Sequence, residues 1–106
     1  MLTAEIIPSV KVKHAKDTTD NSKVWFDYWA KHVKEDISAY KFWHCECCNR
    51  DVPINEMVGA HVIKADNSDD TVYIYPTCDT CNKTYKGDKA DTKTFSVPIT
   101  ELIPVP

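Results

Sequence analysis

Residues 23–37 carry the most regular hydrophobic pattern in the chain. An apolar residue recurs at every fourth position, at Trp25, Trp29, Val33 and Ile37. This spacing predicts an amphipathic α-helix with one apolar face. The polar segment 16–22 before it predicts a loop that also offers N-cap residues. The candidate N-caps are Asp20, Asn21 and Ser22.

Short strands are predicted on both sides of this helix. The alternating run Val10-Lys11-Val12 is typical of an edge strand. Residues 58–63 and 71–75 predict the two strands of a hairpin. The acidic connection 64–70 lacks the glycine turn and the distal glutamate of a calcium loop, so we expect a solvated loop.

The C-terminal part predicts a second, shorter helix followed by extended chain. Residues 79–86 favour a helix that stops at Gly87. A strand is expected over 94–97. The apolar, proline-containing segment 102–106 is expected to pack as an extended edge.

The pattern gives further expectations for individual side chains. Tyr40, Phe42 and Trp43 continue the aromatic residues of the predicted helix, and we expect them in the core. His14 and His32 lie in polar surroundings and are expected at the surface. Together these elements predict an α+β fold in one domain spanning residues 1–106, with an N-terminal amphipathic helix.

Charge and composition narrow the classes of function. The chain of 106 residues carries 13 basic and 16 acidic side chains, a formal net charge of −3. Proteins that bind nucleic acid through charge usually have a basic excess, so this class is disfavoured. The sequence has no secretory signal and no apolar run long enough for a membrane helix. We therefore expect a cytoplasmic protein that does not enter the membrane.

Four of the five cysteines form two matching pairs. Cys45 and Cys48 have C-x2-C spacing, and Cys78 and Cys81 repeat it after 29 intervening residues. Two such turns supply four soft thiolates, the donor set of a structural Zn²⁺ site. In a reducing compartment, cysteines are metal ligands more often than disulfides.

Some alternatives remain open at this stage. Iron–sulfur ligation uses the same sulfur atoms. Cys47 lies inside the first pair, so a register that uses Cys47 in place of Cys45 or Cys48 is also open. We favour Cys45 and Cys48 because their spacing matches the second pair, and we expect Cys47 to be buried or beside the site.

The order cysteine pair, hairpin, cysteine pair and helix, over about residues 43–87, resembles a treble-clef zinc finger. More narrowly, it resembles the ββα unit of HNH endonucleases that carry an extra zinc site. The matching segments are Cys45-x2-Cys48, Gly59-Ala60-His61-Val62 and Tyr75-Pro76-Thr77-Cys78-Asp79-Thr80-Cys81-Asn82-Lys83. The flanking residues also resemble small uncharacterised bacterial and phage zinc proteins.

The resemblance implies two catalytic residues if the chain is a nuclease. His61 would be the general base, and Asn82 would bind a second divalent metal against the scissile phosphate. The motif is degenerate, however. Ala60 stands where the group usually has a metal-binding aspartate, and Tyr73 stands near the position of the residue that orients the base. We favour the other reading of His61, as a structural histidine that is bonded to a backbone carbonyl or supports the metal site.

Three functions follow from these observations. The favoured one is a non-catalytic zinc module that binds a protein partner or regulates it, because the metal-binding aspartate of the nucleases is replaced by Ala60 and the net charge is negative. The first alternative is a metal-dependent HNH-type endonuclease acting on DNA. The second alternative is a zinc finger that binds nucleic acid without catalysis.

Overall fold

The computed structural model describes residues 8–16 and 22–106. It confirms the α+β class. The predicted N-caps Asp20 and Asn21 fall outside the described residues. The strands are β1 (Ser9–His14), β2 (Phe42–Cys45), β3 (Arg50–Pro53), β4 (Met57–Lys64), β5 (Tyr73–Cys78), β6 (Thr94–Pro98) and β7 (Ile103–Pro104). The α-helices are α1 (Ser22–Val33) and α2 (Asp79–Thr84). The short 3-10 helices are η1 (Ile37–Ala39), η2 (Ile54–Glu56), η3 (Gly87–Thr92) and η4 (Ile99–Glu101).

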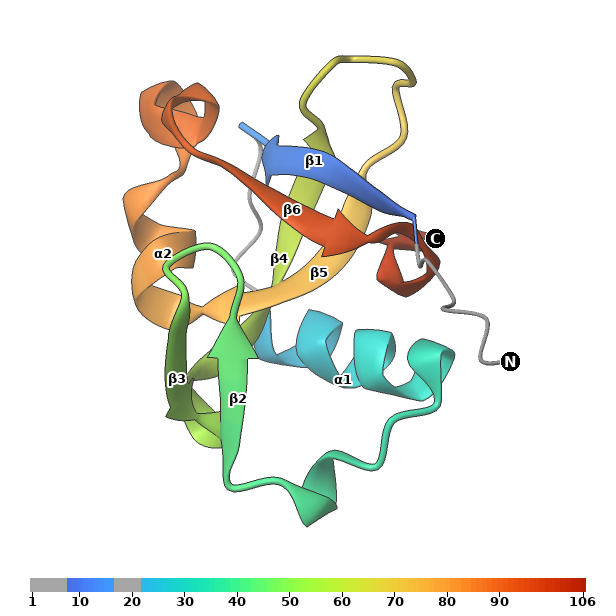
Figure 1. The fold of residues 1–106 in the computed structure, drawn as a ribbon, viewed down its shortest axis with the longest axis vertical. Coiled ribbons are helices and arrows are strands. Elements are labelled where there is room, and N and C mark those ends of the chain that lie inside the picture. Colours follow the sequence, from blue (N-terminus) through green and yellow to red (C-terminus); the bar gives the residue numbers. More distant parts are fainter. Residues whose placement is uncertain (1–7, 17–21) are drawn as a thin grey trace, which may run out of the picture.

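The main sheet is antiparallel and has the strand order β6-β1-β4-β5-β7. Figure 1 shows β1 and β6 side by side, crossing the β4–β5 hairpin at a steep angle, with α1 below them. A separate hairpin, β2–β3, extends beside the start of α2 (Figure 1). The sheet therefore combines a local hairpin with strands that come from the two ends of the described chain.

Helix α1 packs against β4 and β5 through its aromatic side chains. Trp29 is 1% exposed and Phe26 is 4% exposed. The backbones approach closely at Gly59, where an added Cβ would lie 2.4 Å from the amide nitrogen of Phe26. Glycine at this position lets helix and sheet pack at that distance.

Helix α1 ends earlier than its apolar pattern predicts. Lys34 adopts a left-handed backbone with φ of 61°, and the amide of Glu35 donates to the carbonyl of Ala30 at 2.9 Å. This is the hydrogen bond of a Schellman motif. Ile37, the last residue of the predicted apolar stripe, belongs instead to η1.

The placement of β1 corrects two sequence-based predictions. The run Val10-Lys11-Val12 was predicted as an edge strand, yet β1 lies between β6 and β4. The prediction failed because one neighbour of β1, strand β6, lies more than 80 residues later in the chain. His14, expected at the surface, is fully buried in the same strand, between the rings of Tyr85 and Phe95.

The aromatic segment after α1 is a third correction. Tyr40 is 44% exposed and Phe42 is 60% exposed, so neither is a core residue. Tyr40 is the C-cap residue of η1, and Phe42 is the first residue of β2. Trp43 is partly buried against the core, where its ring meets Trp29 edge to face at 5.8 Å.

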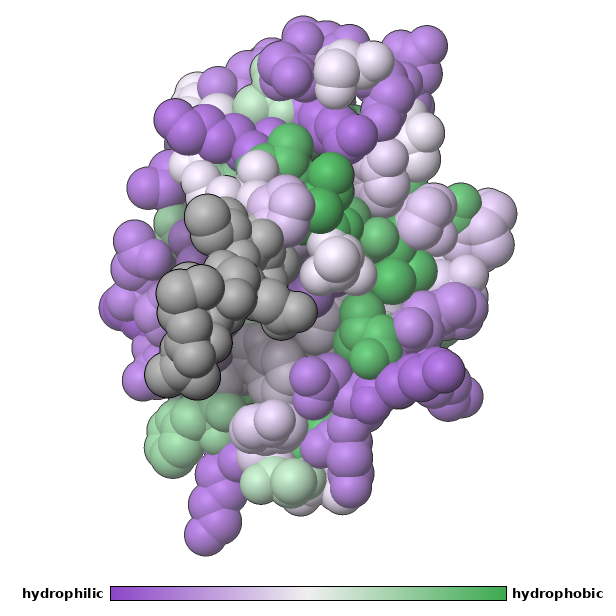
Figure 2. Space-filling view, turned by 45° about the vertical axis from the view of Figure 1, so that its right-hand side comes forward, coloured by the Kyte–Doolittle hydropathy of each residue, from purple (hydrophilic) through white to green (hydrophobic). Residues whose placement is uncertain are grey.

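The C-terminal segment lies along the edge of the sheet, as predicted. Ile103 and Pro104 pair with β5, and the amide of Val105 donates to the carbonyl of Val72 at 2.9 Å. On the face shown in Figure 2, a narrow band of hydrophobic residues crosses a largely hydrophilic surface. No helix in the described part of the chain is both long enough and apolar enough to span a bilayer.

Candidate metal centre

Two turns bring the four paired cysteines together. Cys45 ends β2, and Cys48 lies in the turn that leads to β3. Asn49 closes this turn, because its backbone is left-handed (φ 57°) and its amide donates to the carbonyl of Cys45 at 2.7 Å. Cys78 ends β5, and Cys81 lies in the first turn of α2.

The sulfur atoms lie at distances suited to one shared ion. The Sγ atoms of Cys45, Cys48, Cys78 and Cys81 all lie within 4.8 Å of one another. The pair Cys48 and Cys78 is separated by 3.9 Å. A tetrahedral zinc with four bonds of about 2.3 Å places its sulfurs about 3.8 Å apart. The cluster can therefore hold a metal ion after small adjustments.

Backbone amides also point at the sulfur atoms. The amide of Cys78 donates to Sγ of Cys45 at 3.3 Å, and the amide of Cys81 donates to Sγ of Cys78 at 3.4 Å. The second bond also caps α2, because Cys78 is its N-cap residue. Hydrogen bonds of this kind stabilise thiolate, the form that binds metal.

In the absence of a nearby cation, burial disfavours the negatively charged thiolate form of these cysteines. Burial raises the pKa of Cys45 to about 11, against the opposing effect of the amides of Cys78 and Cys48. Burial also raises the pKa of Cys81 far above its usual range. A bound divalent ion offsets this cost by pairing with the negative sulfurs.

Cys48 differs from the other cysteines because it faces Arg50. Burial alone would raise the pKa of Cys48, but hydrogen bonds from the Arg50 guanidinium and from neighbouring groups lower it to about 7. Arg50 is therefore placed to offset part of the negative charge of a four-thiolate centre.

The fifth cysteine lies beside this cluster but outside it. Cys47 is 1% exposed, and its thiol is hydrogen-bonded to Cys81. Burial raises its pKa. The geometry thus groups Cys45 and Cys48 with the second pair, in the register that the matched spacing favours, and leaves Cys47 as a buried neighbour.

The two residues that the HNH resemblance implies, His61 and Asn82, lie outside the group of four cysteines. His61, on β4, is 7% exposed and packs against Trp25 with ring centroids 5.3 Å apart. Asn82, on α2, has a buried Oδ1 with no hydrogen-bond partner among the described residues. Their catalytic roles remain predictions.

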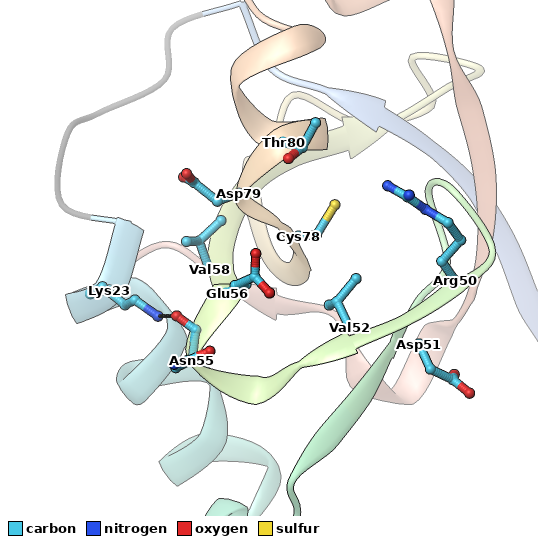
Figure 3. A pocket seen from close by; sticks show the side chains of 10 residues that line it. All are labelled: Lys23, Arg50, Asp51, Val52, Asn55, Glu56, Val58, Cys78, Asp79 and Thr80. Atoms are coloured by element: carbon cyan, nitrogen blue, oxygen red, sulfur yellow. Dashed lines mark hydrogen bonds between the residues drawn. The ribbon is translucent and has the colours of Figure 1, made fainter.

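A cavity of about 520 Å³ adjoins the cysteine cluster. Figure 3 shows Cys78 and Arg50 on facing walls, with Lys23 bonded to the carbonyl of Asn55 at the far end. Neither His61 nor Asn82 lines this cavity. Its walls carry charges of both signs, from Lys23 and Arg50 against Glu56, Asp51 and Asp79.

Comparison of the chain with protein-family models, with curated proteins and with solved structures found no match. The resemblance to HNH and treble-clef proteins therefore rests on the sequence segments alone, and the geometry shows a cysteine cluster that could hold a metal ion.

Proposed function

We propose that this chain is a small zinc-binding module that acts without catalysis, by binding or regulating a protein partner. The observation that carries this proposal is the convergence of four cysteine sulfurs within 4.8 Å of one another. Soft thiolates select zinc over hard cations such as magnesium or calcium. The centre would tie the β2–β3 turn to the junction of β5 and α2.

The order of elements around the site supports a treble-clef scaffold as part of this proposal. A cysteine turn leads into the β4–β5 hairpin, and a second cysteine pair opens α2. This is the order that the HNH resemblance implies for about residues 43–87.

A non-catalytic role is supported by the surroundings of His61. A general base must reach the water that it activates, whereas His61 is 7% exposed and packs against Trp25. Ala60, at the position of the usual acidic ligand, is 1% exposed and has no donor atom. A second, catalytic metal would therefore lack the carboxylate ligand expected at this position.

The zinc proposal is tested by the metal content of the purified protein. We expect one equivalent of zinc per chain by elemental analysis, and a thiolate-to-metal absorption band after replacement by cobalt. Iron in place of zinc, or cysteines oxidised in pairs, would contradict the proposal.

The non-catalytic role is tested by incubating the zinc-loaded protein with plasmid DNA and Mg²⁺, Mn²⁺ or Ni²⁺. We expect no cleavage. Cleavage that disappears in His61→Ala would establish the nuclease alternative. A gel shift with duplex and single-stranded DNA at low salt tests the nucleic-acid-binding alternative, because charge-driven binding is strongest there.

A further inference from the structure

A second cavity, of about 290 Å³, lies on the side of the molecule where β2 follows η1. Its walls are of two kinds. The aromatic residues Tyr40, Phe42 and Trp43 form one, and the carboxylates of Glu35, Glu46 and Glu101 form the other. We call this cavity the aromatic–acidic pocket.

Two of the rings meet as adjoining walls. The centroids of Tyr40 and Trp43 are 4.8 Å apart, and the ring planes are inclined at 74°. Trp43 packs against the buried Trp29 ring. The indole N–H of Trp29 in turn donates to the carbonyl of Glu101 at 2.8 Å. The aromatic walls are thus anchored to the core while Tyr40 and Phe42 remain 44% and 60% exposed.

The three carboxylates create a region of negative potential. Burial, opposed by a hydrogen bond from the Tyr75 hydroxyl, raises the pKa of Glu101, and the charges of Glu35 and Glu46 raise it further. Within 8–16 and 22–106, none of the three has a basic partner within 4.0 Å.

One basic side chain does line the pocket. His44 accompanies the carboxylates there, but its Nδ1 lies 2.9 Å from the carboxylate of Asp51. The Nδ1 atom of His44 is therefore paired with Asp51, on the neighbouring strand β3, and not with a carboxylate of the pocket.

We propose that the aromatic–acidic pocket receives a lysine or arginine side chain from a protein partner. A cation is attracted both by the faces of aromatic rings and by nearby carboxylates. The exposed area of Tyr40 and Phe42 extends the contact beyond one cation, which suits a peptide segment. This inference rests on the proposed interaction role and names the chemistry of the partner.

The test uses the zinc-loaded protein and a pair of short peptides followed by two-dimensional NMR. One peptide, of alternating glycine and arginine, carries the cations, and the other carries neutral citrulline in their place. We expect the arginine peptide to shift the Trp43 indole and the amides around the pocket. The citrulline peptide should shift them much less.

Charge-removing variants keep the test independent of folding. Glu46→Gln and Glu35→Gln are each expected to weaken arginine-peptide binding by about threefold, within the range of exposed ion pairs. Glu56→Gln removes a carboxylate from the other cavity and serves as the matched control, with affinity unchanged. Unchanged amide spectra in each variant would show that the fold is retained.

Three results would overturn the proposal. The first is NMR shifts of equal size from both peptides, and the second is an equal loss of arginine-peptide affinity in Glu56→Gln. The third concerns tetramethylammonium, a small cation used as an additional probe: it would bind while the arginine peptide does not. In each case the protein would still contain zinc and be folded, so the proposed zinc module would stand without this partner.

Discussion

His14 is a titratable residue in an apolar, fully buried environment. The ring is fully buried between Tyr85 and Phe95, and neither nitrogen has a hydrogen-bond partner among the described residues. Burial lowers its pKa from 6.5 to about 4. The neutral ring therefore behaves as an aromatic core side chain, and the fold disfavours its protonation.

This burial predicts a loss of stability in mild acid. Below pH 6.5 the unfolded chain binds a proton that the folded chain does not bind until about pH 4, so the free energy of unfolding falls across this window. Between pH 7 and pH 5 we expect a loss of about 2 kcal/mol from this residue. The check is urea unfolding of the protein and of His14→Leu at both pH values. The free energy of unfolding of the variant should fall less between pH 7 and pH 5. The same loss in both proteins would contradict the assignment.

Gly59 permits the closest contact between α1 and the sheet. An added Cβ would lie 2.4 Å from backbone atoms of Trp25 and Phe26, so helix and strand would have to separate. We expect Gly59→Ala to destabilise the protein by about 3 kcal/mol or more. Urea unfolding measures this.

Gly87→Ala is the control for Gly59→Ala, because it adds the same methyl group at an open position. Its φ is +58°, but an added Cβ there meets nothing within 4 Å. Gly87→Ala should cost only about 1 kcal/mol, from the left-handed backbone alone. Similar losses for the two variants would mean that the contact at Gly59 is looser than described.

At the scale of elements, the cysteine turns are held by backbone geometry as well as by sulfur. The left-handed Asn49 closes one turn, and the N-cap position of Cys78 opens the other. This predicts a sharp difference among the cysteines. Cys81→Ser or Cys78→Ser should abolish zinc binding and unfold the two cysteine turns, because structural zinc contributes about 10–16 kcal/mol in finger peptides.

Cys47→Ala is the matched control for these variants. Its sulfur lies outside the group of four, so the variant should retain one zinc per chain by elemental analysis and a folded circular dichroism spectrum. Loss of zinc in Cys47→Ala, with retention in Cys45→Ala, would instead support the alternative register.

Elements with a local cause were predictable from the sequence. The tryptophan spacing, the alternation in 71–75 and the C-x2-C turns each act within a few residues, and the corresponding helix, hairpin and cysteine cluster are present. The end of α1 was not predictable, because it depends on the left-handed backbone of Lys34 and lysine has no preference for that conformation. The aromatic–acidic pocket was missed because Glu101 joins Glu35 and Trp43 only through the tertiary fold.

At the scale of the molecule, the proposed metal joins the β2–β3 hairpin to the end of the five-stranded sheet. The β2–β3 hairpin is a separate sheet, and the hydrogen bond from the Cys78 amide to Cys45 Sγ is a direct link between it and β5. The smaller hairpin should therefore depend on the metal more than the five-stranded sheet does.

Removal of zinc with a chelator should expose this difference. We expect a lower melting temperature and, in hydrogen exchange followed by mass spectrometry, faster exchange in 42–53 and 78–84 than in β1 and β4. Addition of zinc should restore protection. Uniform acceleration across the chain would show instead that the whole fold depends on the metal as one unit.

The central position of β1 also bears on how the chain is synthesised. Residues 9–13 pair with 94–98, and the amide of Ile99 donates to the carbonyl of Pro8. On a ribosome, the β4–β5 hairpin and the cysteine turns can emerge and associate while β1 still lacks one neighbour. The sheet is completed only after β6 is made, so nascent chains stopped before residue 94 should display an unpaired strand edge that chaperones can bind.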